Sequence, residues 1–315
     1  MDSSEVQEII SCLPQGRTFF PYFKDRYALL LLAELVGEQG RRISALRQSH
    51  YAPLLAKPVV KQALANCGSG RITANDLLSC WPVQAQTLLL KLSHWGGGVD
   101  RRWQQTCRFG YNLVLQLVFS NDHDTQYRRL LKPEFDGYFN YNCHPIAKRR
   151  RNVFFRETLA WARIDLDWQS GEALIEEIQS DWVADATRLQ RRLRLGSGIE
   201  NEYGIRPDRA LVLQYLDHIL ADYARIWDEA MLSATLNFIR RELGLKQIYY
   251  HEFETSIVLK GIEHCKPPRS LYTKLPRRFC LEQTQHVPGF IQQDKTARRV
   301  LKRIKNPLFF KLILN

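Results

Sequence analysis

The order of apolar and polar residues divides the chain into two parts. Up to about residue 105, apolar residues occur in compact runs that end in glycine or follow a capping residue, as at 27–37, 58–66 and 72–81. Such runs predict helices, with Thr73 as an N-cap. The glycine-rich stretch 94–100 favours a boundary. We therefore predict a mainly helical N-terminal region, 1–105, followed by a second domain, 106–315.

The pattern changes to alternation after this boundary. Residues 111–119, 158–168 and 173–181 predict strands, the last two forming a hairpin around a turn at 169–172. A long helical region, a strand, a short helix, a basic helix and an apolar strand-like end follow at 208–243, 247–253, 255–261, 295–305 and 308–314. This order predicts an α+β fold in which helices pack on a mostly antiparallel sheet.

Composition narrows the class of protein. The longest apolar run, 28–33, is far shorter than the ~20 residues that cross a bilayer. The first ten residues lack the basic and apolar regions of a secretory signal. The seven cysteines are scattered without a closely spaced pair, so we expect reduced thiols rather than disulfides or a metal centre. The sequence indicates a cytoplasmic protein without a membrane partner.

The net charge of +12 favours a polyanionic partner, either nucleic acid or a nucleotide-bearing ligand. A basic surface without such a partner is the alternative. The candidate phosphate contacts are 148–151 and a tail set whose three- and four-residue spacing places it on one helix face, namely Lys295, Arg298, Arg299, Lys302 and Arg303. The N-terminal helical region is a candidate for binding a protein partner.

The segment IEEIQSDW, residues 175–182, is the candidate site. It places three acidic groups and a glutamine at the end of a predicted strand. Alternation puts Glu177, Gln179 and Asp181 on one face and Glu176 on the other. Neighbouring carboxylates tend to raise one another's pKa, which suits a general base or a metal ligand set. A solvated strand end paired to arginines is the alternative.

A second group of candidates lies further along the chain. His251 lies near the end of the next predicted strand and could shuttle a proton, although a lone histidine is more often structural. Both strands flank the long helical region, so we expect a concave pocket in which Tyr249, His251 or Tyr272 faces the acidic cluster.

Acidic residues on the predicted hairpin suggest a different chemistry. Asp167 on one strand, with Glu177 and Gln179 on the next, resembles the degenerate motif of restriction-like nucleases, with Gln179 in the lysine position. That resemblance implies a Mg²⁺ ion.

The order of segments resembles two larger families. The segment EEIQSDW, together with its flanking strands and helix over 110–262, resembles a domain of phage-encoded polyvalent proteins. The same order is similar to the GNAT acyltransferase superfamily. There a central strand leads through a phosphate-binding loop into a helix, then a splayed strand, then a helix near a catalytic tyrosine.

The GNAT resemblance implies a role for each segment. Residues 173–181 would be the central strand and 246–253 the splayed strand. Tyr272 would be the general acid, and Glu177 or Asp181 the base. The coenzyme A pyrophosphate would bind a loop containing Arg191, Arg192, Arg194, Gly196 and Gly198. The loop departs from the family pattern, because Arg192 precedes Gly196 by four positions rather than three and the next predicted helix begins some ten residues after Gly198.

The GNAT resemblance implies an acyltransferase that uses acyl-coenzyme A and acts on an amine, and the basic charge favours a nucleic-acid-linked acceptor such as tRNA. The alternatives are a nucleic-acid-binding or metal-dependent nuclease module using Asp167, Glu177 and Gln179, and an inactive binding module. As a base on a strand end, Glu177 is expected to tolerate replacement by glutamine without unfolding, while activity is lost.

Overall fold

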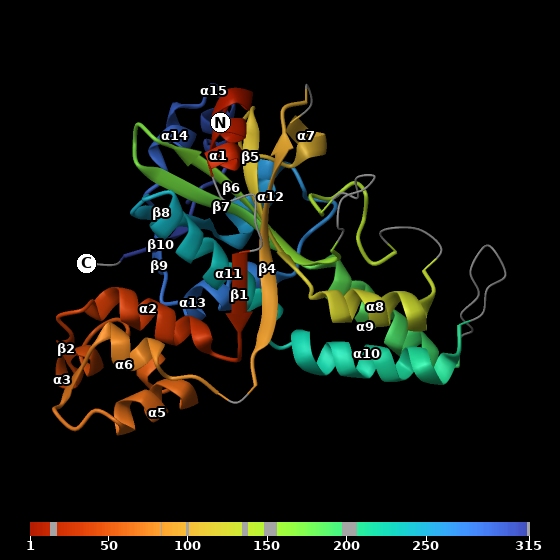
Figure 1. Ribbon diagram of the computed structural model, residues 1–315. Helices are drawn as coiled ribbons and strands as arrows, with labels where there is room; N and C mark the ends of the chain where they lie inside the picture. The colour runs from red at the N-terminus through yellow and green to blue at the C-terminus, as the bar shows by residue number, and fades with distance from the viewer. Residues whose placement is uncertain are drawn as a thin grey trace.

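The computed structural model describes residues 1–12, 18–82, 84–98, 101–133, 138–147, 156–196 and 207–313. Within them an eight-stranded sheet runs through the middle of the molecule, and helices gather around it (Figure 1). A pair of two-residue strands forms a second small sheet. The strands are β1 (Thr18–Tyr22), β2 (Arg41–Arg42), β3 (Arg71–Ile72), β4 (Gln86–Gly96), β5 (Tyr111–Val118), β6 (Thr158–Asp167), β7 (Glu172–Gln179), β8 (Gln247–His251), β9 (Glu282–Thr284) and β10 (Phe309–Leu312).

The large sheet has the order β1-β4-β5-β6-β7-β8-β10-β9. Its neighbours are antiparallel, except that β7 and β8 run parallel. The predicted α+β fold with a mostly antiparallel sheet is confirmed. So is the hairpin, because β6 pairs with β7 from Trp161 opposite Gln179 to Asp167 opposite Glu172.

The sheet crosses the predicted domain boundary. Strand β4 lies before residue 106, yet it pairs with β5 from Leu89 opposite Val118 to Gly96 opposite Tyr111. Strand β1 extends the same sheet beyond β4. The mainly helical character predicted for residues 1–105 is therefore not confirmed. The glycine-rich stretch includes the end of a paired strand, where Gly96 adopts φ 107°, a conformation that glycine tolerates.

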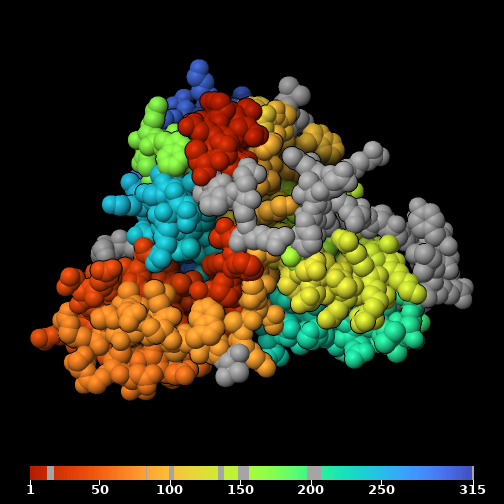
Figure 2. Space-filling view, viewed as in Figure 1, coloured from red at the N-terminus to blue at the C-terminus, as the bar shows by residue number. Residues whose placement is uncertain are grey.

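Most of the described α-helices form three groups around the sheet (Figures 1 and 2). Helices α2–α6 gather beside β1, α8–α10 lie together at another corner, and α1, α14 and α15 lie near the opposite end. The α-helices are α1 (Ser3–Cys12), α2 (Arg26–Val36), α3 (Ile43–Arg47), α4 (Ala52–Leu55), α5 (Pro58–Ala65), α6 (Ala74–Leu78), α7 (Arg101–Gln104), α8 (Asn121–Leu131), α9 (Asp181–Arg194), α10 (Arg209–Tyr223), α11 (Trp227–Asn237), α12 (Phe253–Lys260), α13 (Lys274–Arg278), α14 (Gly289–Gln293) and α15 (Lys295–Leu301). A π-helical turn, Phe238–Glu242, extends α11, and a 3-10 helix spans Arg269–Tyr272. The predicted cap is present, because the Thr73 side chain and the Asp76 side chain form a capping box on α6.

Both faces of the central strands are buried. On one face α9 and α11 pack on β6, and the main apolar core includes Trp182, Ala162 and Ile178. On the other face a smaller core includes Leu174, Tyr249 and Phe290. Polar side chains of β6 and β7 are consequently removed from water and need partners inside the protein. None of the described helices has the length and apolar character needed to span a membrane.

His123 on α8 provides a test of this packing. Its ring stacks on Phe119 with a centroid distance of 3.6 Å, and its Nε2 lies 3.0 Å from the hydroxyl of Tyr215. Burial lowers the pKa of His123 from 6.5, although the hydrogen bond with Asp124 opposes this. The unfolded chain therefore binds this proton more readily than the folded protein, and His123 removes stability as the pH falls below about 6.5.

We expect His123→Gln to reduce the loss of unfolding free energy between pH 7.5 and pH 5.5, as measured by urea denaturation at each pH. His50→Gln is the control, because the His50 side chain is 43% exposed. If His123→Gln and His50→Gln lose stability equally with acid, the buried neutral state of His123 is wrong.

Candidate functional site

A β-bulge in β7 shapes the candidate site. Glu177 pairs with Arg163, whereas Ile175 pairs with the next residue of β6, Ile164, so Glu176 is an extra residue on β7. A bulge interrupts strict alternation. Glu176 consequently contacts Cys107, and Glu177 contacts Arg163, which also donates to the Gln105 carbonyl. Both carboxylates therefore lie on the face covered by segment 104–107, and the prediction that they lie on opposite faces is wrong.

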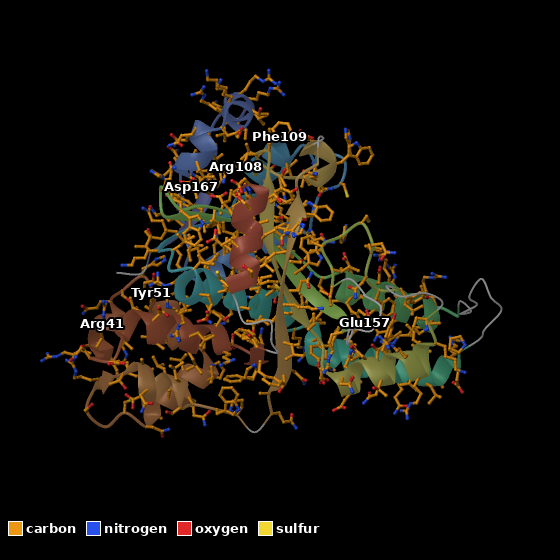
Figure 3. The ribbon with its side chains drawn as sticks, turned by 45° about the horizontal axis from the view of Figure 1, so that its top comes forward. Arg41, Tyr51, Arg108, Phe109, Glu157 and Asp167 are labelled. Atoms are coloured by element: carbon orange, nitrogen blue, oxygen red, sulfur yellow. The ribbon has the colours of Figure 1, made fainter. Side chains whose placement is uncertain are left out.

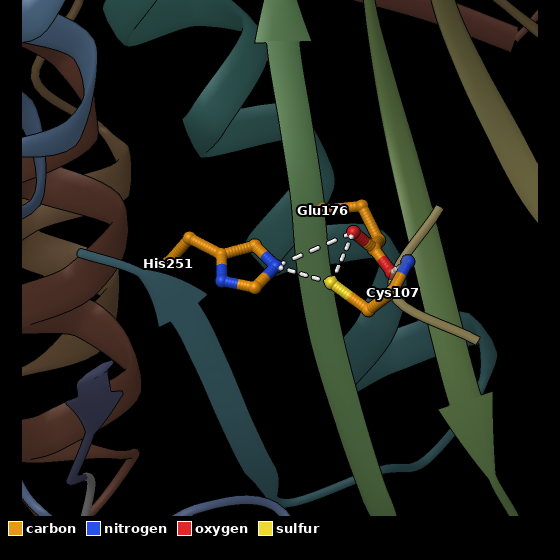
Figure 4. A group of neighbouring side chains, drawn as sticks. All are labelled: Cys107, Glu176 and His251. Atoms are coloured by element: carbon orange, nitrogen blue, oxygen red, sulfur yellow. Dashed lines mark hydrogen bonds and ion pairs between the residues drawn. The ribbon is translucent and has the colours of Figure 1, made fainter. Parts of the chain in front are cut away.

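Glu176 belongs to a wholly buried cluster with Cys107 and His251 (Figure 4). The Cys107 thiol donates to Glu176 Oε2 at 3.0 Å, and its backbone N–H donates to Oε1 at 3.1 Å. His251 Nε2 lies 3.3 Å from Oε2 and 3.1 Å from the Cys107 sulfur. His251 therefore contacts Glu176, one of the four residues of the predicted acidic cluster. Cys107, 69 residues before Glu176, was not a candidate in the sequence.

The electrostatics of this cluster favour an ionised Glu176. Burial alone would raise the pKa of Glu176, but the hydrogen bond and charge of His251, together with Arg163 and Lys260, lower it to about 2. Burial lowers the pKa of His251, against the effect of Glu176. Since Glu176 contacts Nε2 rather than Nδ1, the trio differs from a nucleophile–base–orienter triad. Its sulfur, nitrogen and oxygen atoms lie within 4.8 Å of one another and could hold a metal ion.

Glu177 lies in a neighbouring ion network. It pairs with Arg163, and Lys260 Nζ lies 3.4 Å from its carboxylate. Lys260 Nζ also lies 3.4 Å from the hydroxyl of Tyr272, which is fully buried. Burial would raise the pKa of Glu177, but Lys260 and Arg163 lower it, and burial raises the pKa of Tyr272. Glu177 and Tyr272, the predicted base and acid, therefore belong to a structural network. Arg163 and Lys260 hold the Glu177 carboxylate in its ionised form.

Asp181 and Gln179 belong to a third group, which reaches the surface. Asp181 Oδ2 lies 2.8 Å from His144 Nδ1, and Gln179 Nε2 lies 3.2 Å from the same nitrogen. The Asp181 side chain is 1% exposed, whereas that of His144 is 30% exposed. A buried carboxylate that fixes a partly exposed imidazole is an arrangement suited to proton transfer.

The segment that carries His144 is fixed on the sheet. The Gln116 side chain of β5 donates to the carbonyl of Pro145 at 2.9 Å, and the Ala147 N–H donates to Thr158 at 2.9 Å. The Trp161 ring packs edge-on against His144. Sequence reasoning did not select His144, because no local pattern connects it with Asp181, 37 residues later.

The structure corrects the predicted phosphate-binding loop, because its arginines lie in a helix. Arg191, Arg192 and Arg194 lie in the last turn of α9, and Gly196 follows that helix; Gly198 lies outside the described residues. Between β7 and α9 stands one residue, Ser180, whose hydroxyl caps the helix by accepting the Val183 N–H. Asp181 then occupies the helix N-terminus, where a phosphate would otherwise bind.

The basic segments have different outcomes. Residues 148–151 lie outside the described residues. In the tail, α15 ends at Leu301, before Lys302 and Arg303. All five predicted tail cations are exposed, although only part of the set lies on the helix.

The predicted magnesium residues do not meet. Asp167 pairs with Glu172, whereas Glu177 pairs with Arg163, four positions away on β6. At roughly 3.3 Å per residue this separates the two positions by about 13 Å. Asp167 instead accepts the Ser170 N–H in the hairpin turn, and Figure 3 shows it near Arg108. The nuclease motif is therefore wrong as a shared metal site.

The expected pocket also differs from what is observed. Glu176, Glu177 and Asp181 each belong to a different one of the three groups described above, and Tyr249 contacts Glu172 and His286 instead.

Comparison of the chain with protein-family models, curated proteins and solved structures finds no match. The assignment of a function therefore depends on the geometry of these groups.

Proposed function

We propose that the protein is a GNAT-like acyltransferase acting on an amine, with His144 as the general base. The main support for this proposal is the point at which the parallel pairing between two strands stops, in the only parallel pair among the described strands. Strands β7 and β8 pair from Glu172 opposite Gln247 to Ile175 opposite Tyr250, and β7 then continues to Gln179. The GNAT resemblance implies such a central strand and splayed strand, joined through helices, and β7 and β8 are joined through α9, α10 and α11.

The part of the β7 edge beyond its pairing with β8 is the place that we assign to an extended donor. Beyond Ile175, no described strand pairs with β7 on its β8 side. Lys260 Nζ donates to the Glu176 carbonyl there at 3.2 Å, so a bound donor would replace this contact. An amide-containing chain such as pantetheine can pair with a strand edge in the same way.

The His144–Asp181 pair supplies the proton chemistry. An amine attacks the acyl carbonyl carbon, a C–N bond forms, and the C–S bond of the thioester breaks. His144 accepts the proton of the attacking amine and passes it to the departing thiolate. Asp181 holds Nδ1 at 2.8 Å, which orients the ring so that its other nitrogen is the one that exchanges the proton.

Exposed arginines support a nucleic-acid-linked acceptor. Four of them continue along α9 from the end that carries Asp181, namely Arg188, Arg191, Arg192 and Arg194. Arg188 donates to the hydroxyl of Tyr141 at 3.0 Å, next to the His144 segment. A cationic helix beside the base suits the phosphates of a charged tRNA, whose binding would weaken as salt rises.

Calorimetric titration with acetyl-coenzyme A and with acetyl-pantetheine tests the donor. We expect saturable binding of both, with similar affinities, because the α9 N-terminus carries Asp181 in place of a phosphate loop. Desulfo-coenzyme A and free acetate are the controls. The first lacks the thiol and the acyl group, and the second lacks the pantetheine chain. If neither thioester binds, the strand edge is not a donor site.

A further inference from the structure

We propose that Cys107 Sγ, Glu176 Oε2 and His251 Nε2 bind one transition-metal ion of the Zn²⁺ type. This site is separate from the His144–Asp181 pair and does not depend on the acyltransferase proposal. The three donors come from the segment before β5, from β7 and from β8, and they meet in the second apolar core (Figure 4).

The spacing of the donors fits a small ion. The three separations between donor atoms are 3.0, 3.1 and 3.3 Å. A tetrahedral zinc ion with bonds of about 2.0–2.3 Å places its ligand atoms roughly 3.3–3.6 Å apart. Outward movement of a few tenths of an ångström by each side chain would therefore open the site.

The chemistry of the donors selects the class of metal. Thiolate and imidazole are preferred by zinc and its neighbours, whereas Mg²⁺ and Ca²⁺ prefer oxygen donors. Binding would release the proton of the Cys107 thiol, and the thiolate and the Glu176 carboxylate would balance the two charges of the ion. Three protein donors leave a fourth coordination position for water or a substrate atom.

The surroundings give independent support. A carboxylate, a thiol and an imidazole, each wholly buried, are costly in an apolar core unless their bonding is complete. Among the described residues His251 Nδ1 has no hydrogen-bond partner. Glu176 Oε1 accepts the Cys107 N–H at 3.1 Å, and such a bond orients a metal-binding carboxylate.

Metal analysis and Co²⁺ titration test the site. We expect purified protein to contain one zinc ion per chain, and the stripped protein to bind one Co²⁺ with visible bands of tetrahedral geometry and a sulfur-to-cobalt charge-transfer band. Cys107→Ser should remove the charge-transfer band. Cys67→Ser is the matched control, because its partly buried thiol contacts the Ala63 carbonyl and is not one of the three donors.

The wild-type protein decides the question even if Cys107→Ser fails to fold. Absence of zinc after expression in zinc-supplemented medium, together with absence of Co²⁺ bands, would overturn the proposal. The cluster would then be a hydrogen-bonded network in which the Cys107 thiol serves only as a donor to Glu176. Persistence of the charge-transfer band in folded Cys107→Ser would equally exclude the assigned ligand.

Discussion

Glu177→Gln is expected to lower the free energy of unfolding by about 3–5 kcal/mol, because it leaves a buried charge pair incomplete. The side chains of Arg163 and Lys260 are 2% and 0% exposed, and both contact the Glu177 carboxylate. Glutamine preserves the shape of the side chain but not its charge. The sequence alone predicted that this variant would fold normally, and the buried cations reverse that expectation. Equilibrium denaturation followed by circular dichroism measures the change.

Asp217→Asn is the matched control for Glu177→Gln. Asp217 pairs with Arg194, and these side chains are 51% and 60% exposed, so its loss should cost less than ~1 kcal/mol. The double variant Glu177→Gln with Lys260→Met should recover part of the lost stability, because it removes one unpaired cation. Equal costs for Glu177→Gln and Asp217→Asn would show that Glu177 is not a buried counter-ion.

Local pattern was enough to predict the hairpin. The observed ends of β6, β7 and β8 are within one or two residues of the predicted ends. Alternation and turn residues are local signals, because they depend only on neighbours in the chain. Strand β4 was missed, since its place in the sheet depends on pairing with β5. The bulge at Glu176 was also missed, because periodicity assumes an uninterrupted strand.

The sequence located the polar segment but could not assign its roles. Whether a carboxylate is a base or a counter-ion depends on partners that lie far away in sequence, and Lys260 is 83 residues from Glu177. His144 and Cys107 could not be connected with β7 for the same reason. The sequence did contain a signal that the segment with Arg191, Arg192 and Arg194 is helical, however. Leu189 and Leu193 are four residues apart, the spacing of a buried helix face, and both are buried.

His144→Gln is expected to lower the rate of acyl transfer ~100-fold or more, the typical effect of losing a general base. The change should cost little stability, because the side chain is 30% exposed and the glutamine amide can still donate to the buried Asp181 carboxylate. Asp181→Asn should lower the rate as well, since it removes the carboxylate that orients the ring. His50→Gln is the control, because His50 is also partly exposed and also lies beside a carboxylate, that of Glu282.

The release of coenzyme A from acetyl-coenzyme A is the measurement that tests the proposed function most directly. The thiol is detected with a chromogenic disulfide, first with free polyamines and then with charged tRNA as the acceptor. We predict release that requires an acceptor, that continues in His50→Gln, and that is ~100-fold slower or more in His144→Gln with unchanged unfolding. Absence of release by the wild-type protein with either acceptor, or equal rates in the wild type and His144→Gln, would contradict it.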